Sequence, residues 1–195
     1  MAELKLPVSE EEIRKLKVGD FVELTGRMIT GRDAAHKWLM EDLRDEVMPF
    51  MKDTVIYHCG PVIAENDDGS YDFVAAGPTT SIREEPYQAD VIGRYGLRGV
   101  IGKGGMAAKT LAGLGEHGAV YLHAIGGAAQ VLARAIPSVE RVFMLDEFGV
   151  PEALWVIEVE KFPVVVSMDS HGASLHDEVE ADSKAKLDEL LGLAG

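Results

Sequence analysis

Hydrophobic and polar positions in the first part of the chain change between strand and helix spacing. Over residues 20–30 apolar and polar side chains alternate, which predicts a strand. Over residues 32–50 apolar side chains recur three and four positions apart, which predicts a helix. Ahead of both, Ser9 and the three glutamates after it have the form of a capping box, which predicts a short helix ending near Gly19.

From residue 54 onward, β-rich and helical patterns follow one another in short segments. The turn Asn66-Asp67-Asp68-Gly69 separates two of them, and residues 164–168 form an almost unbroken apolar run, as in a buried strand. The pattern predicts an α/β fold in one domain over residues 1–195, with a short N-terminal helix and a C-terminal helix. Strands are expected at 54–58, 71–76, 98–101, 119–123, 141–145, 155–159 and 164–168, and helices at 80–95 with a break at Pro86, 104–114, 128–135 and 175–192.

The charge of the chain narrows the class of partner. The formal net charge is −14, with 33 acidic and 19 basic residues. Nucleic acids and anionic membranes require a basic face, so neither is expected as a partner. No apolar run approaches the roughly 20 residues that span a bilayer, and the first residues lack the features of a signal peptide.

Cys59 is the one cysteine of the sequence. It permits no internal disulfide, so a reducing cytoplasm is the expected location. It also cannot hold an iron–sulfur cluster, which needs about three or four thiolates. No cofactor or metal is therefore expected on this chain alone.

Two glycine-containing turns carry the most informative chemistry. Gly-Pro-Thr-Thr-Ser-Ile-Arg at 77–83 offers hydroxyls, backbone N–H groups and the Arg83 guanidinium, and Ile-Gly-Lys-Gly-Gly at 101–105 offers the Lys103 ammonium. Both turns follow expected strands, and together they predict a pocket for a small anion. Alternatives stay open, because Thr79 could be a helix cap and Lys103 a solvated residue of a tight turn. The sequence fits neither a dinucleotide fingerprint nor a Walker A loop.

A third turn, Thr-Gly-Arg-Asp at 30–33, leads from an expected strand into a helix and places Arg32 at the mouth of that helix. Asp33 is explained by the helix dipole. His36 could act as an acid or base, but hydrogen-bonded structure is favoured for a histidine inside an amphipathic helix. His58 and Cys59 are neighbours on an expected strand, so they point to opposite faces and form no nucleophilic dyad.

Taken together, four ordered segments resemble one family, the β subunit or C-terminal domain of class I fumarate hydratases and the related L(+)-tartrate dehydratases. The similarity runs from about residue 15 to 170. Where a methionine is expected after Arg83, this chain has Glu84. The segments are Thr-Gly-Arg-Met-Ile-Thr-Gly-Arg-Asp-Ala-Ala-His-Lys, Tyr-His-Cys-Gly-Pro-Val, Gly-Pro-Thr-Thr-Ser-Ile-Arg and Gly-Lys-Gly-Gly.

The resemblance implies a swivelling three-layer β/β/α domain and a site shared with a partner. In this family a [4Fe-4S] cluster is held by the α subunit, and the β domain contributes substrate-binding residues. Matched motif by motif, the carboxylate-binding arginines fall on Arg32 and Arg83, the substrate-binding lysine on Lys103 and the hydroxyl proposed as catalytic base on Thr79. A heterotetramer of α and β subunits is also implied.

The implied activity is the reversible hydration of fumarate to (S)-malate. Cations at the site suit a dicarboxylate, because removal of a proton beside a carboxylate builds up negative charge there. An alcohol such as Thr79 is a poor base without an activating neighbour, and Lys103 could lower its pKa. L(+)-tartrate dehydratase is the alternative within the enzyme class, and a non-catalytic carboxylate-binding scaffold is the alternative outside it.

Overall fold

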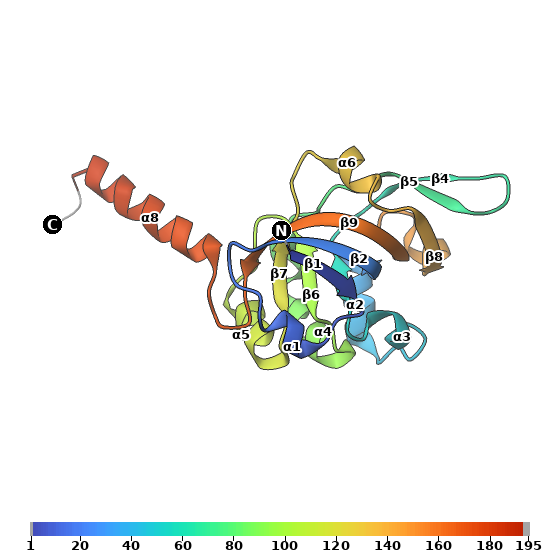
Figure 1. Cartoon of the computed structure of the whole chain (residues 1–195), viewed down its shortest axis with the longest axis horizontal. Coiled ribbons are helices and arrows are strands. Elements are labelled where there is room, and N and C mark those ends of the chain that lie inside the picture. The colour runs from blue at the N-terminus through green and yellow to red at the C-terminus, as the bar shows by residue number, and fades with distance from the viewer. Residues whose placement is uncertain (1, 193–195) are drawn as a thin grey trace.

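The structure is a computed structural model and describes residues 2–192. Short strands and helices alternate along the chain (Figure 1), which confirms the α/β class. In order, the elements are β1 (Ala2–Leu6), α1 (Glu10–Ile13), β2 (Phe21–Thr30), α2 (Asp33–Glu41), α3 (Met48–Met51), β3 (Val55–Tyr57), β4 (Val62–Glu65), β5 (Tyr71–Ala75), the 3-10 helix η1 (Ser81–Glu84), α4 (Glu85–Tyr95), β6 (Gly99–Gly102), α5 (Ala108–His117), β7 (Val120–His123), α6 (Ala129–Ala133), β8 (Ser138–Phe143), α7 (Leu145–Phe148), β9 (Leu154–Met168) and α8 (Leu175–Leu190).

The main sheet closes on itself through its longest strand. Strands β2, β3, β6 and β7 are parallel neighbours in that order. Strand β9 pairs antiparallel with β7 at one side and with β2 at the other, where Phe21 lies opposite Val165. Strands β1 and β8 extend the sheet beyond the ring. In Figure 1, β9 arches over the parallel strands and closes a small barrel.

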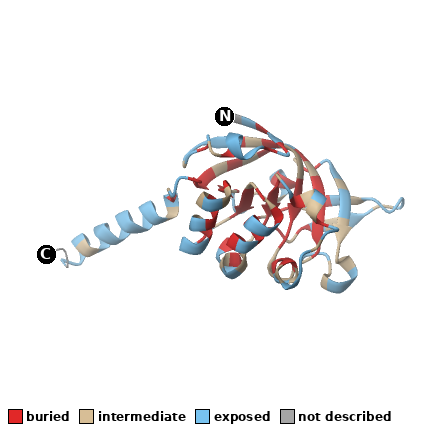
Figure 2. Cartoon of the chain, turned by 90° about the horizontal axis from the view of Figure 1, so that it is seen from below, coloured by how far each residue is buried: buried red, intermediate tan, exposed pale blue. Residues whose placement is uncertain are grey.

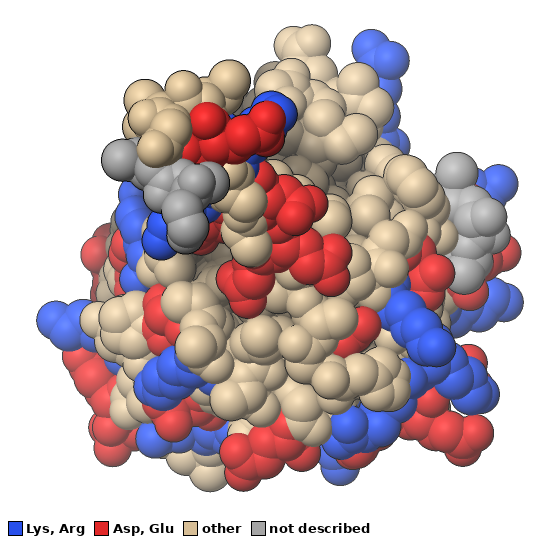
Figure 3. All heavy atoms as spheres, turned by 90° about the vertical axis from the view of Figure 1, so that its left-hand side faces the viewer, with Lys and Arg blue, Asp and Glu red and all other residues tan. Residues whose placement is uncertain are grey.

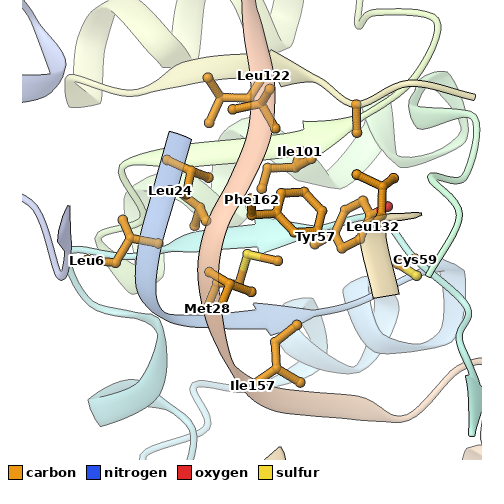
Figure 4. Packing of buried hydrophobic residues seen from close by; sticks show 14 of the residues in the cluster. Leu6, Leu24, Met28, Tyr57, Cys59, Ile101, Leu122, Leu132, Ile157 and Phe162 are labelled. Atoms are coloured by element: carbon orange, nitrogen blue, oxygen red, sulfur yellow. The ribbon is translucent and has the colours of Figure 1, made fainter. Parts of the chain in front are cut away.

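The interior of this ring is filled by apolar side chains from every strand that forms it. Leu24 and Met28 come from β2, Tyr57 from β3, and Phe162 from the bend of β9, and all four are fully buried. Tyr57 and Phe162 meet edge to face, with their ring centroids 5.3 Å apart. Figure 4 shows them converging with residues of β6 and β7. Close packing of these buried side chains holds the parallel strands in place, and the candidate site lies at the ends of those strands.

A second apolar cluster lies on the outer face of the parallel strands. It joins residues of β3 and β6 to the inward faces of α2, α4 and α5, among them Leu39, Tyr95 and Leu114. The helices cover one side of the parallel strands and β9 covers the other, so the layer order is β/β/α (Figure 2). The swivelling motion implied by the resemblance stays a prediction.

Two elements extend away from this body. Helix α8 begins at the Ser174 cap, whose side chain accepts from the N–H of Asp177, and then projects outward with mostly exposed side chains (Figure 2). The hairpin of β4 and β5 projects at the other end. Figure 3 views the side on which α8 projects and shows acidic and basic side chains interspersed there.

Several expected helices are wrong in their extent. The short helix expected to end near Gly19 ends at Ile13, and the helix expected at 104–114 is α5, at 108–117. The expected helix 32–50 is divided, because α2 ends at Glu41 and α3 begins only at Met48. The Tyr95 hydroxyl donates to the carbonyl of Leu39 at 3.0 Å and so satisfies the end of α2. The expected helix 80–95 begins as the 3-10 segment η1. Pro86 stands in the first turn of α4 and does not break it, since a first-turn residue needs no N–H.

The two strands expected at 155–159 and 164–168 are one strand, β9. The residues between them, which include Pro163, looked like an interruption. They form the bend at which β9 passes between its partners, and Lys161 there has a positive φ of 51°. Proline is tolerated because the local register is already irregular, with a shift between Leu24 and Gly26 on β2.

Candidate active site

The residues singled out by sequence gather at one edge of the sheet. Strands β2, β3 and β6 run parallel, so their carboxyl ends meet at the same edge. Arg32 follows the end of β2, His58 the end of β3 and Lys103 the end of β6. The edge at the carboxyl ends of parallel strands is where α/β proteins commonly bind ligands, because loops and helix starts converge there.

The turn at 79–81 lies against Lys103 as a short additional strand. The N–H of Lys103 donates to the carbonyl of Thr79 at 3.2 Å, and the N–H of Ser81 donates to the carbonyl of Lys103 at 3.0 Å. The N–H of Thr79 donates to the carbonyl of His58 at 2.7 Å. Main-chain bonds therefore fix Thr79 beside Lys103, and both side chains are half-buried. Thr79 is not the cap of η1, a position that Thr80 occupies without a side-chain bond.

Arg32 and Arg83 converge on the carboxylate of Asp33. Nη2 of Arg83 lies 2.7 Å from Oδ2 of Asp33, and Nη2 of Arg32 lies 4.0 Å from the same oxygen. Arg32 also pairs with Glu152 at 3.2 Å. The turn after β2 and the 3-10 helix η1 thus bring two guanidinium groups toward one carboxylate oxygen. This is the arrangement that a carboxylate ligand needs.

Two neighbours hold Arg32 in place. Oε2 of Glu152 accepts from the N–H of Ala34 at 3.0 Å, so Glu152 satisfies the start of α2 and orients the guanidinium with its other oxygen. Gly60 leaves the space that the guanidinium fills, because a Cβ there would lie 2.2 Å from Nη1 of Arg32. A larger residue at Gly60 would displace the arginine.

Lys103 differs from the two arginines in its charge environment. Within residues 2–192, Arg32 and Arg83 form ion pairs with acidic side chains, whereas Lys103 forms none. Its carbon chain runs past Gly126, where a Cβ would lie 3.7 Å from the lysine Cδ. An ammonium without an acidic partner at the end of β6 is available to an anion that enters the edge of the sheet.

Glu84 is a buried carboxyl group behind the arginines. Its side chain is fully buried, and within the described residues neither carboxylate oxygen has a hydrogen-bond partner. Burial, with the nearby charge of Asp33, raises the pKa of Glu84 to about 7. Oε2 of Glu84 lies 3.8 Å from Nδ1 of the equally buried His36.

His36, His58 and the cysteine have structural surroundings. His36 and His58 are buried and hydrogen-bonded, as favoured for His36 from the sequence. Cys59 points into the interior of the barrel, and burial raises the pKa of its thiol to about 12. In the part of the chain that the structure describes, no three His, Cys, Asp or Glu side chains are grouped to hold a metal ion. In that same part no helix is both long and apolar enough to cross a bilayer.

Comparison with known proteins decides the family. Residues 1–179 match the family model described as Fumarase C-terminus. The chain belongs to this family. The resemblance found in the four sequence segments is therefore confirmed.

Relatives of this Fumarase C-terminus chain have two kinds of name. A putative class I fumarate hydratase of Geobacillus stearothermophilus is 54% identical over 94% of the chain, which spans 35% of that relative's length. A putative L(+)-tartrate dehydratase subunit beta of Methanocaldococcus jannaschii is 42% identical, over 95% of the chain and 96% of the relative. The L(+)-tartrate dehydratase subunit beta of Escherichia coli K12 is 36% identical, over 88% and 85%. Both names describe hydro-lyases.

Sequence reasoning missed the acidic side chains that organise the site. Asp33 was explained by the helix dipole alone, yet it pairs with Arg83 from a different segment. Glu152 lies before β9, far along the chain from Arg32, and no local pattern marks it. Gln88, on the buried face of α4, was also missed, because a single glutamine inside an amphipathic helix carries no recognisable signal.

Proposed function

We propose that this chain is the β subunit of an iron–sulfur-dependent hydro-lyase that interconverts fumarate and (S)-malate. The observation that carries the proposal is the convergence of Arg32 and Arg83 on one carboxylate oxygen, at the sheet edge where Thr79 and Lys103 are bonded through their main chains. Membership of the Fumarase C-terminus family supports the hydro-lyase class.

In this proposal a substrate carboxylate takes the position that Asp33 holds between the arginines. Asp33 and Arg83 are both about half exposed, so their ion pair is weak and can exchange for a ligand. Glu152 keeps Arg32 oriented during that exchange, because its second oxygen is anchored to the start of α2. The second carboxylate of the dianion would then be bound by Lys103.

Proton transfer falls to Thr79 in this scheme. Removing the proton beside a carboxylate of malate puts additional negative charge on that carboxylate, and cations bound to it stabilise the transition state more than the ground state. Thr79 in its ionised, alkoxide form accepts the proton in this direction and becomes a neutral hydroxyl, and in the hydration direction that hydroxyl returns the proton to carbon. Lys103, whose main chain is bonded to that of Thr79, has a positively charged side chain that favours the ionised form of the hydroxyl.

The partner in the proposal is a cluster-bearing α subunit, with which this chain forms a heterotetramer. The buried thiol of Cys59 and the lack of a metal-binding group among residues 2–192 fit a cluster held by that partner. When bound there, the [4Fe-4S] cluster would supply a Lewis acid for the hydroxyl group that is added or removed. A reducing cytoplasm is the proposed location, since both Cys59 and such a cluster suit it.

The test is anaerobic co-expression with the α subunit, followed by assays on fumarate, (S)-malate and L-tartrate. We expect fumarate hydration by the complex and none by this chain alone, which should be colourless. Activity by this chain alone in air would contradict the shared site. A complex that binds dicarboxylates without turnover would favour the scaffold alternative.

L(+)-tartrate dehydration is the second candidate. Its support is that the relatives named as tartrate dehydratase β subunits are matched over 96% and 85% of their lengths, whereas the chain spans 35% of the relative named as a fumarate hydratase. Fumarate is preferred because the relative named as a fumarate hydratase has the higher identity, 54%. The ratio of kcat/KM for the two substrates decides between them.

A further inference from the structure

A buried glutamine joins two histidines behind the candidate active site. Oε1 of Gln88 lies 2.9 Å from Nε2 of His36 and 2.8 Å from Nε2 of His58. All three side chains are fully buried, and the two rings meet edge to face at 5.0 Å. They come from α4, α2 and the end of β3, so one amide group connects three elements.

The hydrogen bonding sets the protonation of this group. Burial lowers the pKa of both histidines, so each ring is neutral and has one N–H. Nδ1 of His36 lies 2.9 Å from the carbonyl of Arg32, which only accepts, so Nδ1 bears the proton and Nε2 accepts. The Gln88 amide satisfies this arrangement when it is turned so that its NH2 group faces the rings and donates one N–H to each Nε2. Oε1 then takes the position at which Nε2 has no partner among the described residues.

The hydrogen-bonded contacts continue from His58 to the turn at 79–81, which lies beside Lys103. Nδ1 of His58 is hydrogen-bonded to Oγ of Ser81 at 2.8 Å, and the hydroxyl of Tyr121 donates to the same oxygen at 2.9 Å. Ser81 reaches both because residue 102 is a glycine, since a Cβ there would lie 1.9 Å from Oγ of Ser81. The N–H of Ser81 is in turn bonded to the carbonyl of Lys103.

We propose that Gln88 is a positioning residue of the candidate active site. Through His58 and Ser81 it fixes the turn that bears Thr79 and Lys103, and through His36 it fixes the main chain at Arg32. The two sides of the site come from different elements, and this amide is a buried link between them. The kinetic part of the inference rests on the proposed function, whereas the positioning part does not.

The matched control is Tyr95, on the same helix α4. Its hydroxyl donates to the carbonyl of Leu39 and so also ties α4 to α2 through a buried polar bond, but at the end of α4 away from Gln88. Gln88→Met removes the two contacts of the amide, with His36 and His58. Tyr95→Phe removes the bonds of the hydroxyl with the main chain of Leu39, Asp42 and Arg44. Both substitutions change the side-chain volume little. A purely structural role predicts similar effects of the two variants on stability and on the site.

The first measurement is amide hydrogen exchange of the 195-residue chain by NMR. In Gln88→Met, we expect the amides of Thr79, Ser81 and Lys103 to exchange at least about tenfold faster, because their turn opens locally. In Tyr95→Phe they should stay within about twofold of the wild type. Equal acceleration in both variants, or none in Gln88→Met, overturns the proposal.

The second measurement is steady-state kinetics of the complex with the α subunit. Gln88→Met should lower kcat by about tenfold or more with a smaller change in KM, since misplaced groups affect the transition state most. Tyr95→Phe should leave both near wild type. If Gln88→Met does not fold, Ser81→Ala breaks the same network, with the buried Thr54→Val at the other end of β3 as its control. An inactive wild-type complex would refute the proposed function, and amide exchange would still decide the positioning.

Discussion

The buried carboxyl of Glu84 makes the stability of the chain depend on pH in an unusual direction. Its pKa is raised from 4.5 to about 7, chiefly by burial. The folded chain therefore holds this proton more tightly than the unfolded chain. Between these two pH values the free energy of unfolding falls as pH rises. Above pH 7 it is lowered by the full cost of ionising the buried carboxyl group.

The size of the effect follows from the shift. Each pKa unit corresponds to about 1.4 kcal/mol, so ionisation of Glu84 in the folded chain costs about 3 kcal/mol. Glu84→Gln keeps the shape of the side chain and removes the titration. We expect the variant to gain up to about 3 kcal/mol over the wild type at pH 8, and progressively less toward pH 5.

The assay is urea unfolding followed by circular dichroism, with wild type and variant compared at several pH values from about 4.5 to 8, which covers the interval over which the linkage acts and the plateau above it. Glu84→Met is the second variant, with the residue that the resemblance leads one to expect after Arg83. The two variants differ in packing but should share the same pH-dependent difference from wild type. A difference that does not change with pH would refute the raised pKa. If the free energy of unfolding of the wild type instead rises relative to both variants as pH rises, ionised Glu84 is paired with Arg32 or His36.

The remaining predictions concern turnover by the complex. Lys103→Ala and Arg83→Ala should each lower kcat/KM by about one to two orders of magnitude, the equivalent of one charge-assisted hydrogen bond, with Tm nearly unchanged. Near-normal kinetics would remove that residue from the site. Arg32→Lys should be far more harmful than Arg27→Lys, because Arg27 pairs with Glu140 on β8, away from the sheet edge, and the reverse order in kcat/KM would show that the site is misplaced. Thr79→Ala should lower kcat more than it raises KM, and Thr79→Ser should retain much of the activity. Equal loss of Tm with unchanged kcat would leave Thr79 a structural residue.

Sequence alone was enough to locate the candidate residues at the ends of strands. Glycine turns after short β-rich runs mark positions such as Arg32 and Lys103, because the turn chemistry is local in sequence. The alternation of β and helical patterns also predicted the α/β class, which the structure confirms. Turn motifs and strand or helix periodicity involve residues only a few positions apart, so the spacing of residues in the sequence predicts them.

Features that depend on distant residues could not be predicted in this way. Closure of the ring by β9 requires a strand that bends near Pro163, which in sequence looks like an interruption. The pairing of Arg32 with Glu152 and the burial of Gln88 between His36 and His58 are set by packing of separate elements. Tertiary contact decides them, and no local propensity reports it.

The closed ring also has a consequence for synthesis of the chain on the ribosome. Strand β2 emerges early, but its partner β9 is among the last segments made, since Phe21 pairs with Val165. Before β9 is made, β2 and β7 each expose an unpaired strand edge. Pairing between strands as far apart in sequence as β2 and β9 is slow. A nascent or truncated chain that stops before β9 should therefore aggregate, and expression should benefit from slow synthesis at low temperature or from chaperones that shield β2 and β7.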